Sequence, residues 1–127
     1  MITTHTQSIL IVEDHEVLRR SMFEWLRMMY PDCTMYEAAT GEEGVRIARE
    51  YNPAIIVMDI KLPNIDGFEA TRRIKKYNSS IKIIVVTAHE GEYYKKKAIE
   101  AGGSAFISKR TMASVLPETL NSMFQKM

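Results

Sequence analysis

The sequence lacks the features that mark disulfide-rich, nucleic-acid-binding, membrane-spanning or secreted proteins. Its single cysteine, Cys33, cannot form an internal disulfide, and we expect a reducing, cytoplasmic location. Its 17 basic and 16 acidic side chains give a net charge of +1, so direct nucleic-acid binding by this domain is not expected. No apolar run approaches the roughly 20 residues that a membrane-spanning helix needs. Residues 1–7 also lack the basic and apolar regions of a signal peptide.

Two kinds of ligand site are disfavoured as well. The sequence has no group of histidines and cysteines at zinc-binding spacing. A glycine-rich phosphate loop does not follow the first apolar run, where Glu13-Asp14-His15 stands instead. At 127 residues, the chain is long enough for one domain with a hydrophobic core. We expect a flexible segment over residues 1–7 and a single domain over residues 8–127.

What the sequence does contain is a regular alternation of strand and helix patterns. Five short apolar runs predict strands, at residues 8–12, 33–38, 54–59, 81–86 and 104–108. Helical patterns follow them, at residues 15–29, 40–50, 66–77 and 89–101, and after Ser114. Strict alternation with short connections predicts an α/β fold, with a parallel sheet and helices on both faces.

Capping residues mark where several of these helices begin. Thr40 and Glu43 have the spacing of a capping box, and Asp66 is placed to cap the helix that follows it. Pro117 restricts where the last helix can start: if Ser114 is its N-cap, Pro117 falls in the first turn, where its missing N–H costs little.

Polar side chains stand at the ends of four of the predicted strands. Glu13 and Asp14 follow the first strand, Asp59 ends the third, Thr87 follows the fourth and Lys109 the fifth. The carboxyl ends of parallel strands share one edge of a sheet, where ligands bind in open α/β folds. We therefore expect these five residues to meet in one crevice.

The chemistry of this set points to phosphoryl transfer. Three neighbouring carboxylates repel one another, and a divalent cation and a lysine offset that repulsion. Mg²⁺ fits best, since it prefers oxygen ligands and keeps several waters. Asp59 would then be the nucleophile that accepts a phosphoryl group, Lys109 would neutralise phosphoryl oxygens, and the Thr87 hydroxyl would hydrogen-bond one of them.

With these residues in order, the whole chain resembles the receiver domains of two-component response regulators, the CheY-like family. No single motif is specific to this family, but the order and spacing of the motifs are. The matching pieces are Glu13-Asp14-His15, Asp59 with Leu62-Pro63 and Asp66-Gly67, Thr87-Ala88, Ala101-Gly102, and Phe106 three residues before Lys109.

The resemblance implies a flavodoxin-like (βα)5 fold, doubly wound, with strand order 2-1-3-4-5. It implies that Asp14, Asp59 and the backbone carbonyl of Lys61 bind Mg²⁺, with Glu13 holding metal-bound waters. The donor would be a phosphohistidine on a sensor histidine kinase or a phosphotransfer protein. Such a domain is a phosphoacceptor switch that assists its own phosphorylation and dephosphorylation, rather than an enzyme.

The resemblance also implies how the switch acts. Thr87 and Phe106 match the family's switch pair, and Lys61 and His89 stand where side chains adjust the lifetime of the phosphoryl group. The surface that changes would comprise the helix at 89–101, the strand at 104–108 and the last helix. This surface would control a partner, a homodimer or a DNA-binding domain that follows this sequence, as in regulators of the NarL/LuxR type.

Two positions depart from the common pattern of the family. The acid pair is Glu13-Asp14 rather than two aspartates, which keeps the direct metal ligand. Arg110 follows Lys109, where proline, often after a cis bond, is usual. Because a cis bond before a non-proline residue costs about 2.5–4 kcal/mol, the peptide is either trans or strained.

Two alternative functions share parts of this pattern. A phosphohydrolase of the haloacid-dehalogenase type would also use an aspartate nucleophile, but it needs a second aspartate two residues later, where Lys61 stands. A nucleotide-binding flavodoxin-like protein would need a phosphate loop in place of Glu13-Asp14-His15. The switch is the function that all the polar strand ends support.

Overall fold

The computed structural model describes residues 7–127. Five strands alternate with five α-helices, as predicted. The strands are β1 (Ser8–Val12), β2 (Thr34–Ala38), β3 (Ile55–Met58), β4 (Lys82–Thr87) and β5 (Ala105–Ser108). The helices are α1 (Glu16–Met29), α2 (Gly41–Tyr51), α3 (Gly67–Tyr77), α4 (Glu92–Ala101) and α5 (Met112–Gln125), with a 3₁₀ turn, η1 (Lys109–Thr111), before α5.

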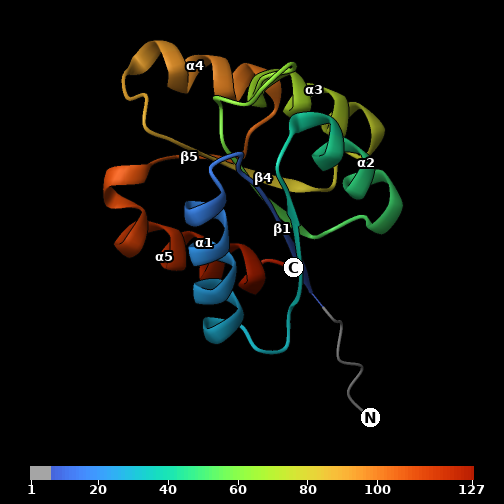
Figure 1. The fold of residues 1–127 in the computed structure, drawn as a ribbon, viewed down its shortest axis with the longest axis vertical. Helices are drawn as coiled ribbons and strands as arrows, with labels where there is room; N and C mark the ends of the chain where they lie inside the picture. The colour runs from blue at the N-terminus through green and yellow to red at the C-terminus, as the bar shows by residue number, and fades with distance from the viewer. Residues whose placement is uncertain (1–6) are drawn as a thin grey trace.

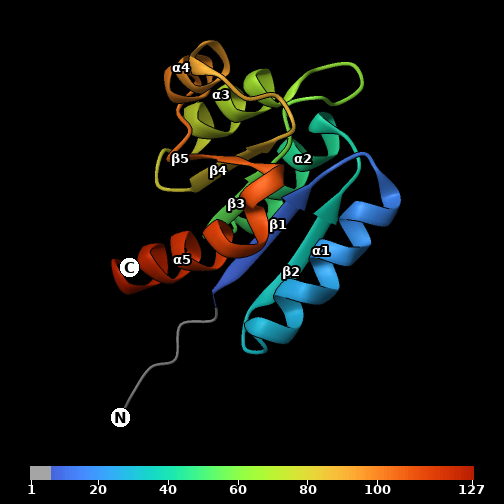
Figure 2. The ribbon, with the colours of Figure 1, turned by 90° about the vertical axis from the view of Figure 1, so that its left-hand side faces the viewer.

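The five strands form one parallel sheet, seen nearly edge-on in Figure 1. Their order is β2-β1-β3-β4-β5, which can be followed in Figure 2. This is the predicted flavodoxin-like topology. Val12 at the end of β1 pairs in register with Met58 at the end of β3, and Thr87 at the end of β4 pairs with Ser108 of β5. The residues that follow these strands therefore leave the sheet at the same edge.

Helices cover both faces of the sheet, with α1 and α5 on one side and α2, α3 and α4 on the other (Figure 2). Alternate residues of the central strands supply the two cores. Ile9, Ile11 and Val57 pack with α1 and α5, whereas Leu10 and Ile56 pack with the other three helices. Because β3 is buried on both faces, its sequence reads as an unbroken apolar run.

The predicted caps of α2 and α3 are confirmed. Thr40 Oγ1 accepts the Glu43 N–H at 3.0 Å, and Asp66 Oδ1 accepts the Glu69 N–H at 2.9 Å. The Glu43 carboxylate reaches back to the N–H of Ala39, at 2.8 Å, one residue earlier than an ideal capping box would place it.

Two helices begin at residues other than those that the sequence suggested. The helix expected from residue 89 begins at Glu92, because the His89 N–H donates to Thr87 Oγ1 and Gly91 has φ of 120°. Ser114 is not an N-cap: α5 continues directly from η1, and the Ser114 hydroxyl donates to the Thr111 carbonyl. Pro117 consequently lies inside α5 rather than in its first turn.

Most of the predicted segment 1–7 lies outside the described residues, so the division at residue 8 stays a prediction. Within the described part, Gln7 already belongs to the sheet region, since its carbonyl accepts the Thr34 N–H at 2.9 Å. Among the helices of residues 7–127, none has the length and apolar character needed to cross a bilayer.

Candidate functional site

Asp59 lies at the centre of the candidate site, directly after β3. Its side chain is nearly buried, and the carboxylate oxygen Oδ1 accepts the backbone N–H of Ile60 at 2.8 Å. The chain then turns back, and the N–H of Gly67 donates to the Ile60 carbonyl at 2.8 Å. A Cβ atom at Gly67 would lie 2.0 Å from the Asp59 carbonyl oxygen, so only glycine fits beside Asp59 here.

The two acids after β1 lie beside Asp59 but differ in exposure. Glu13 is buried, and its backbone N–H continues the sheet by donating to the Ala38 carbonyl at 3.0 Å. Its carboxylate oxygen Oε2 accepts the N–H of His15 at 3.0 Å. Asp14 is exposed. One carboxylate oxygen from each of Glu13, Asp14 and Asp59 lies within 4.8 Å of the others.

Lys109, directly after β5, completes the cluster. Its ammonium nitrogen lies 2.7 Å from Glu13 Oε1 and 3.3 Å from Asp59 Oδ2. The lysine is the first residue of η1, and the peptide that joins it to Arg110 is trans. The Arg110 side chain pairs at 2.8 Å with Glu90 of the β4–α4 loop. With Arg110 rather than proline after it, Lys109 still lies within reach of both acids.

The pKa values of Asp59 and Lys109 are both raised from their usual values. Burial is the main reason that the pKa of Asp59 is raised to about 6, and the Glu13 carboxylate raises it further, against the opposing effect of Lys109. Burial opposes the positive charge of Lys109, but the hydrogen bond to Glu13 and the charges of both acids prevail and raise its pKa. Lys109 therefore carries its charge throughout the physiological range, whereas Asp59 loses its proton as the pH rises through about 6.

Thr87 and Phe106 lie on the same face of the sheet, on the adjacent strands β4 and β5. Thr87 is buried, and its hydroxyl oxygen accepts the His89 N–H at 2.9 Å. Phe106 pairs in register with Val85 and is partly buried against the core under α2, α3 and α4. Since side chains alternate along a strand, Phe106 faces the same side as Val85 and Thr87.

The two remaining predicted residues lie in loops around the cluster. Lys61 is exposed in the loop between β3 and α3. His89 is partly exposed in the loop between β4 and α4, and its ring centroid lies 5.3 Å from that of Tyr94. Neither side chain takes part in the hydrogen bonds that fix Asp59, Glu13 and Lys109.

The donor set suits a hard divalent cation. Three carboxylates face one ammonium group, which leaves two negative charges in excess when all are ionised. Asp14 is open to solvent, so an ion could reach the cluster with part of its hydration shell. Mg²⁺ binds such oxygen donors while it keeps several waters, so the cluster fits this ion.

Two residues next to the cluster, Arg19 and Glu37, were not predicted from the sequence. Arg19 Nη1 donates to the Glu13 carbonyl at 3.0 Å, while its Nε donates to Glu37 Oε1 at 2.9 Å. The available signal was Glu37 itself, a carboxylate within a predicted strand. Such a group needs a cationic partner. His15 was also left unassigned, and it caps α1 through Nδ1.

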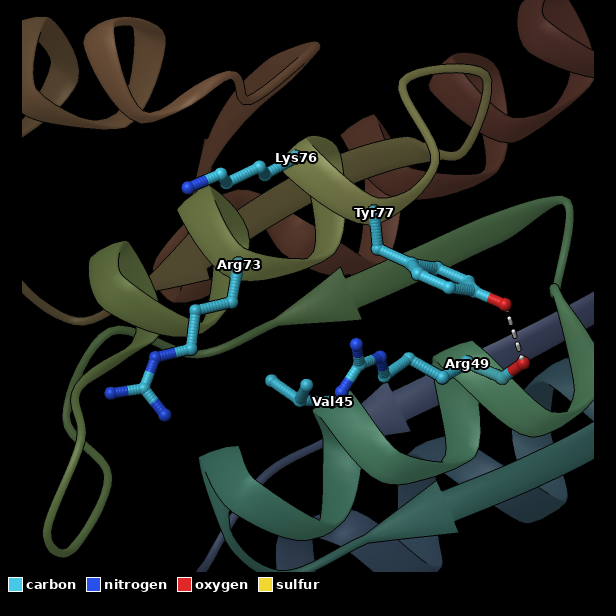
Figure 3. A pocket seen from close by; sticks show the side chains of 5 residues that line it. All are labelled: Val45, Arg49, Arg73, Lys76 and Tyr77. Atoms are coloured by element: carbon cyan, nitrogen blue, oxygen red, sulfur yellow. Dashed lines mark hydrogen bonds between the residues drawn. The ribbon is translucent and has the colours of Figure 1, made fainter.

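A surface cavity of about 520 Å³ lies away from the cluster, between α2 and α3 (Figure 3). Its lining comprises Val45, Arg49, Arg73, Lys76 and Tyr77. The Arg49 guanidinium lies 5.0 Å from the centre of the Tyr77 ring, and Arg73 pairs with Glu69 at 2.9 Å. Because two of its cations have partners within the protein, we assign no ligand to this cavity.

Comparison with known proteins agrees with this geometry. Residues 9–121 match the response regulator receiver domain family. The chain is similar to the transcriptional regulatory protein LiaR of Bacillus subtilis, with 34% identity over 115 residues, and to the response regulator GacA of Pseudomonas aeruginosa, with 28% identity over 116 residues. These matches cover 90% and 91% of this chain, respectively, but 54% of each relative, so the chain spans about half of their length.

A solved structure shows the same likeness in three dimensions. The crystal structure of a two-component response regulator of the LuxR family from Aurantimonas sp. superposes with a TM-score of 0.88 and 32% identity. That match covers 96% of this chain and 87% of the other. The chain therefore belongs to the CheY-like family of response regulator receiver domains, which are phosphoacceptor switches of two-component signal transduction rather than classical enzymes.

Proposed function

We propose that Asp59 is the residue on which this receiver domain is phosphorylated, by a sensor histidine kinase or a phosphotransfer protein. The observation that carries the proposal is the fixed position of its carboxylate. Oδ1 is held by the Ile60 N–H, while Oδ2 faces Lys109 at 3.3 Å, beside Glu13 and Asp14. An anionic oxygen is thereby presented next to a cation and a group of metal-binding acids.

In the proposed transfer, one Asp59 oxygen forms a bond to phosphorus as the bond from phosphorus to the donor histidine nitrogen breaks. The electron pair of that bond stays on the imidazole. With a pKa of about 6, Asp59 is mostly ionised at neutral pH and already carries the negative charge that attack requires. Lys109 neutralises charge on the transferred group, and the Thr87 hydroxyl is placed to hydrogen-bond it.

Four groups would hold Mg²⁺ in this proposal. They are the carboxylates of Asp14 and Asp59, the backbone carbonyl of Lys61, and Glu13 through metal-bound waters. When bound, Mg²⁺ would supply positive charge that offsets both the clustered carboxylates and the phosphoryl oxygens. Glu13 is the least exposed of the three acids and is already bonded to Lys109, which suits it to an indirect role.

Signal output would pass through Thr87, Phe106 and the surface formed by α4, β5 and α5. The Thr87 hydroxyl now accepts the His89 N–H, and turning it toward a phosphoryl group would release the start of the β4–α4 loop. The helix beyond this loop starts without a side-chain cap, because its N-cap residue is Gly91. Tyr93 and Ile99 of α4 are exposed, which leaves apolar surface for a partner.

We further propose that this surface controls a homodimer or a DNA-binding output domain. Support comes from relatives such as LiaR, which is named a transcriptional regulator and is about twice as long as this chain. Lys61 and His89 would adjust the lifetime of the phosphoryl group from the two loops that flank Asp59.

Incubation with acetyl phosphate and Mg²⁺ followed by intact-mass measurement tests the proposal. We expect the mass of one phosphoryl group to be added to the chain, and Asp59→Asn to abolish the addition. Asp32→Asn, which removes an exposed carboxylate outside the cluster, is the control and should be phosphorylated normally. Rapid repeated turnover of a small phosphoester, without a stable adduct, would favour the phosphohydrolase instead.

A further inference from the structure

The Asp14 carboxylate makes no hydrogen bond or ion pair of its own within residues 7–127. Its position therefore depends on the backbone that precedes it. That backbone is the peptide between Glu13 and Asp14, whose carbonyl oxygen accepts a hydrogen bond at 3.0 Å from Nη1 of Arg19. On its other side, the Glu13 N–H is bonded to the Ala38 carbonyl of β2.

Arg19 is itself held in place by β2. Its Nε donates at 2.9 Å to Oε1 of Glu37, and the two side chains are only 14% and 23% exposed. Glu37 pairs in register with Ile11, two residues before Glu13, so its backbone belongs to the same rigid part of the sheet. The guanidinium thus joins a carboxylate on β2 to the peptide that links Glu13 to Asp14 after β1.

We propose that Arg19 is a positioning residue for the divalent-cation site, acting through the Glu13 carbonyl with Glu37 as its anchor. This inference rests on the proposed function, since it assumes that Asp14 binds Mg²⁺. Arg19 does not touch the ion. It sets the direction in which the chain leaves β1, and so where the Asp14 carboxylate stands relative to Asp59.

The role requires a guanidinium and not merely a positive charge. Nε and Nη1 of one planar group donate to two acceptors on different elements, which a single lysine ammonium cannot do with the same geometry. Arg20 offers a matched comparison within the same helix. It also pairs with Glu37, but it is 49% exposed and makes no bond to Glu13.

The test is Mg²⁺ affinity, measured by titration calorimetry on the unphosphorylated chain. We expect Arg19→Met and Arg19→Lys each to weaken binding about tenfold, as is usual when a residue that orients metal ligands is lost. Arg20→Met should bind as tightly as the wild type or slightly more tightly. Loss of any cation near the acids strengthens Mg²⁺ binding through charge alone, so weakening in Arg19→Met cannot be a charge effect.

A second readout separates positioning from general damage. With acetyl phosphate as donor, Arg19→Lys should need about tenfold more Mg²⁺ for half-maximal phosphorylation but reach a near-normal rate at saturation. Mg²⁺ binding by Arg19→Lys and Arg19→Met within twofold of the wild type would overturn the inference. If Arg19→Met does not fold, the Mg²⁺ affinity of Arg19→Lys alone tests the inference. A wild-type chain that binds no Mg²⁺ would instead refute the proposed metal site itself.

Discussion

The ammonium group of Lys109 lies nearer to Glu13 than to Asp59. The distances are 2.7 Å to Glu13 Oε1 and 3.3 Å to Asp59 Oδ2. Lys109 is therefore bonded most directly to the more buried of the two acids, which leaves the Asp59 oxygen less tightly engaged. This arrangement is compatible with the proposed phosphorylation of Asp59, which requires a free carboxylate oxygen. The bond to buried Glu13 also makes Lys109 important for stability.

We expect Lys109→Met to lower the free energy of unfolding by about 1–3 kcal/mol at pH 8 without divalent cations. The substitution leaves two adjacent carboxylates without a cation, and protonation of Asp59 relieves part of this repulsion. The loss should therefore be smaller at pH 5. Urea unfolding followed by Trp25 fluorescence measures both values, with the exposed Lys126→Met as control. An equal loss at both pH values would indicate lost packing of the lysine stem instead.

The second prediction concerns the pH dependence of stability. Burial, aided by Glu13, raises the pKa of Asp59 from 3.8 to about 6, so the folded chain binds this proton more tightly than the unfolded chain. The stability contributed by this proton is complete below pH 4 and is lost as the pH rises through 6. Asp59→Asn removes the titration. We expect it to stabilise the metal-free protein by about 3 kcal/mol above pH 7 and hardly at all below pH 4.

Urea unfolding of Asp59→Asn and wild type in EDTA, from pH 4 to pH 8, measures this difference. Asp32→Asn, an exposed carboxylate, should show a difference from wild type that hardly changes with pH. A stabilisation by Asp59→Asn that is constant, or that grows toward acidic pH, would contradict the raised pKa.

Mg²⁺ should stabilise the protein, and its removal should reverse the effect. At a concentration a hundred times its dissociation constant, we expect a gain of about 2.7 kcal/mol at pH 7.5. The gain should shrink at pH 5, where protons compete for Asp59. Asp14→Asn should abolish most of it, whereas Asp32→Asn should retain it. Thermal unfolding in MgCl₂ and in EDTA provides the comparison, and an Asp14→Asn protein that gains as much as wild type would exclude Asp14 as a ligand.

Gly67 should tolerate no side chain. A Cβ there would lie 2.0 Å from the carbonyl oxygen and 2.8 Å from the carbonyl carbon of Asp59, and backbone atoms cannot yield as a flexible side chain does. We expect Gly67→Ala to cost about 3 kcal/mol and to shift the amide resonances of Asp59 and Ile60.

Gly91→Ala is the matched control for this substitution. A Cβ added at Gly91 would have no neighbouring atom within 4 Å. An alanine held at the φ of +120° would still cost about 1–2 kcal/mol of backbone strain. The Asp59 resonances should stay in place in this variant. If the two variants shift those resonances alike, close contact with Gly67 is not what fixes Asp59.

The positions of the strand ends could be predicted because each one follows from a short stretch of sequence. An unbroken apolar run before Asp59 indicates a strand buried on both faces, and alternation with helices makes the strands parallel. Parallel strands then bring Glu13, Asp14, Asp59 and Lys109 to one edge without further information. The resemblance to receiver domains supplied the strand order, which composition and periodicity alone did not fix.

Helix starts were less predictable where side chains and backbone compete for the same hydrogen bonds. Thr87 reads as the end of a strand, yet its hydroxyl also accepts the His89 N–H and delays the start of α4. Pro117 suggested a helix that starts near Ser114, but η1 leads directly into α5 and carries the proline inside the helix. In both cases the path of the preceding backbone, and not the helix propensity of single residues, set where the helix begins.

The order of residues along the chain was enough to determine the alternating fold and the meeting of acids and lysine at one sheet edge, because both follow from hydrophobic period and strand direction. Tertiary structure alone decided that Glu13 is buried while Asp14 is exposed, that Lys109 bonds more closely to Glu13, and that Arg19 reaches the Glu13 carbonyl. These contacts join residues on different elements, so they depend on how α1 and η1 pack against the sheet.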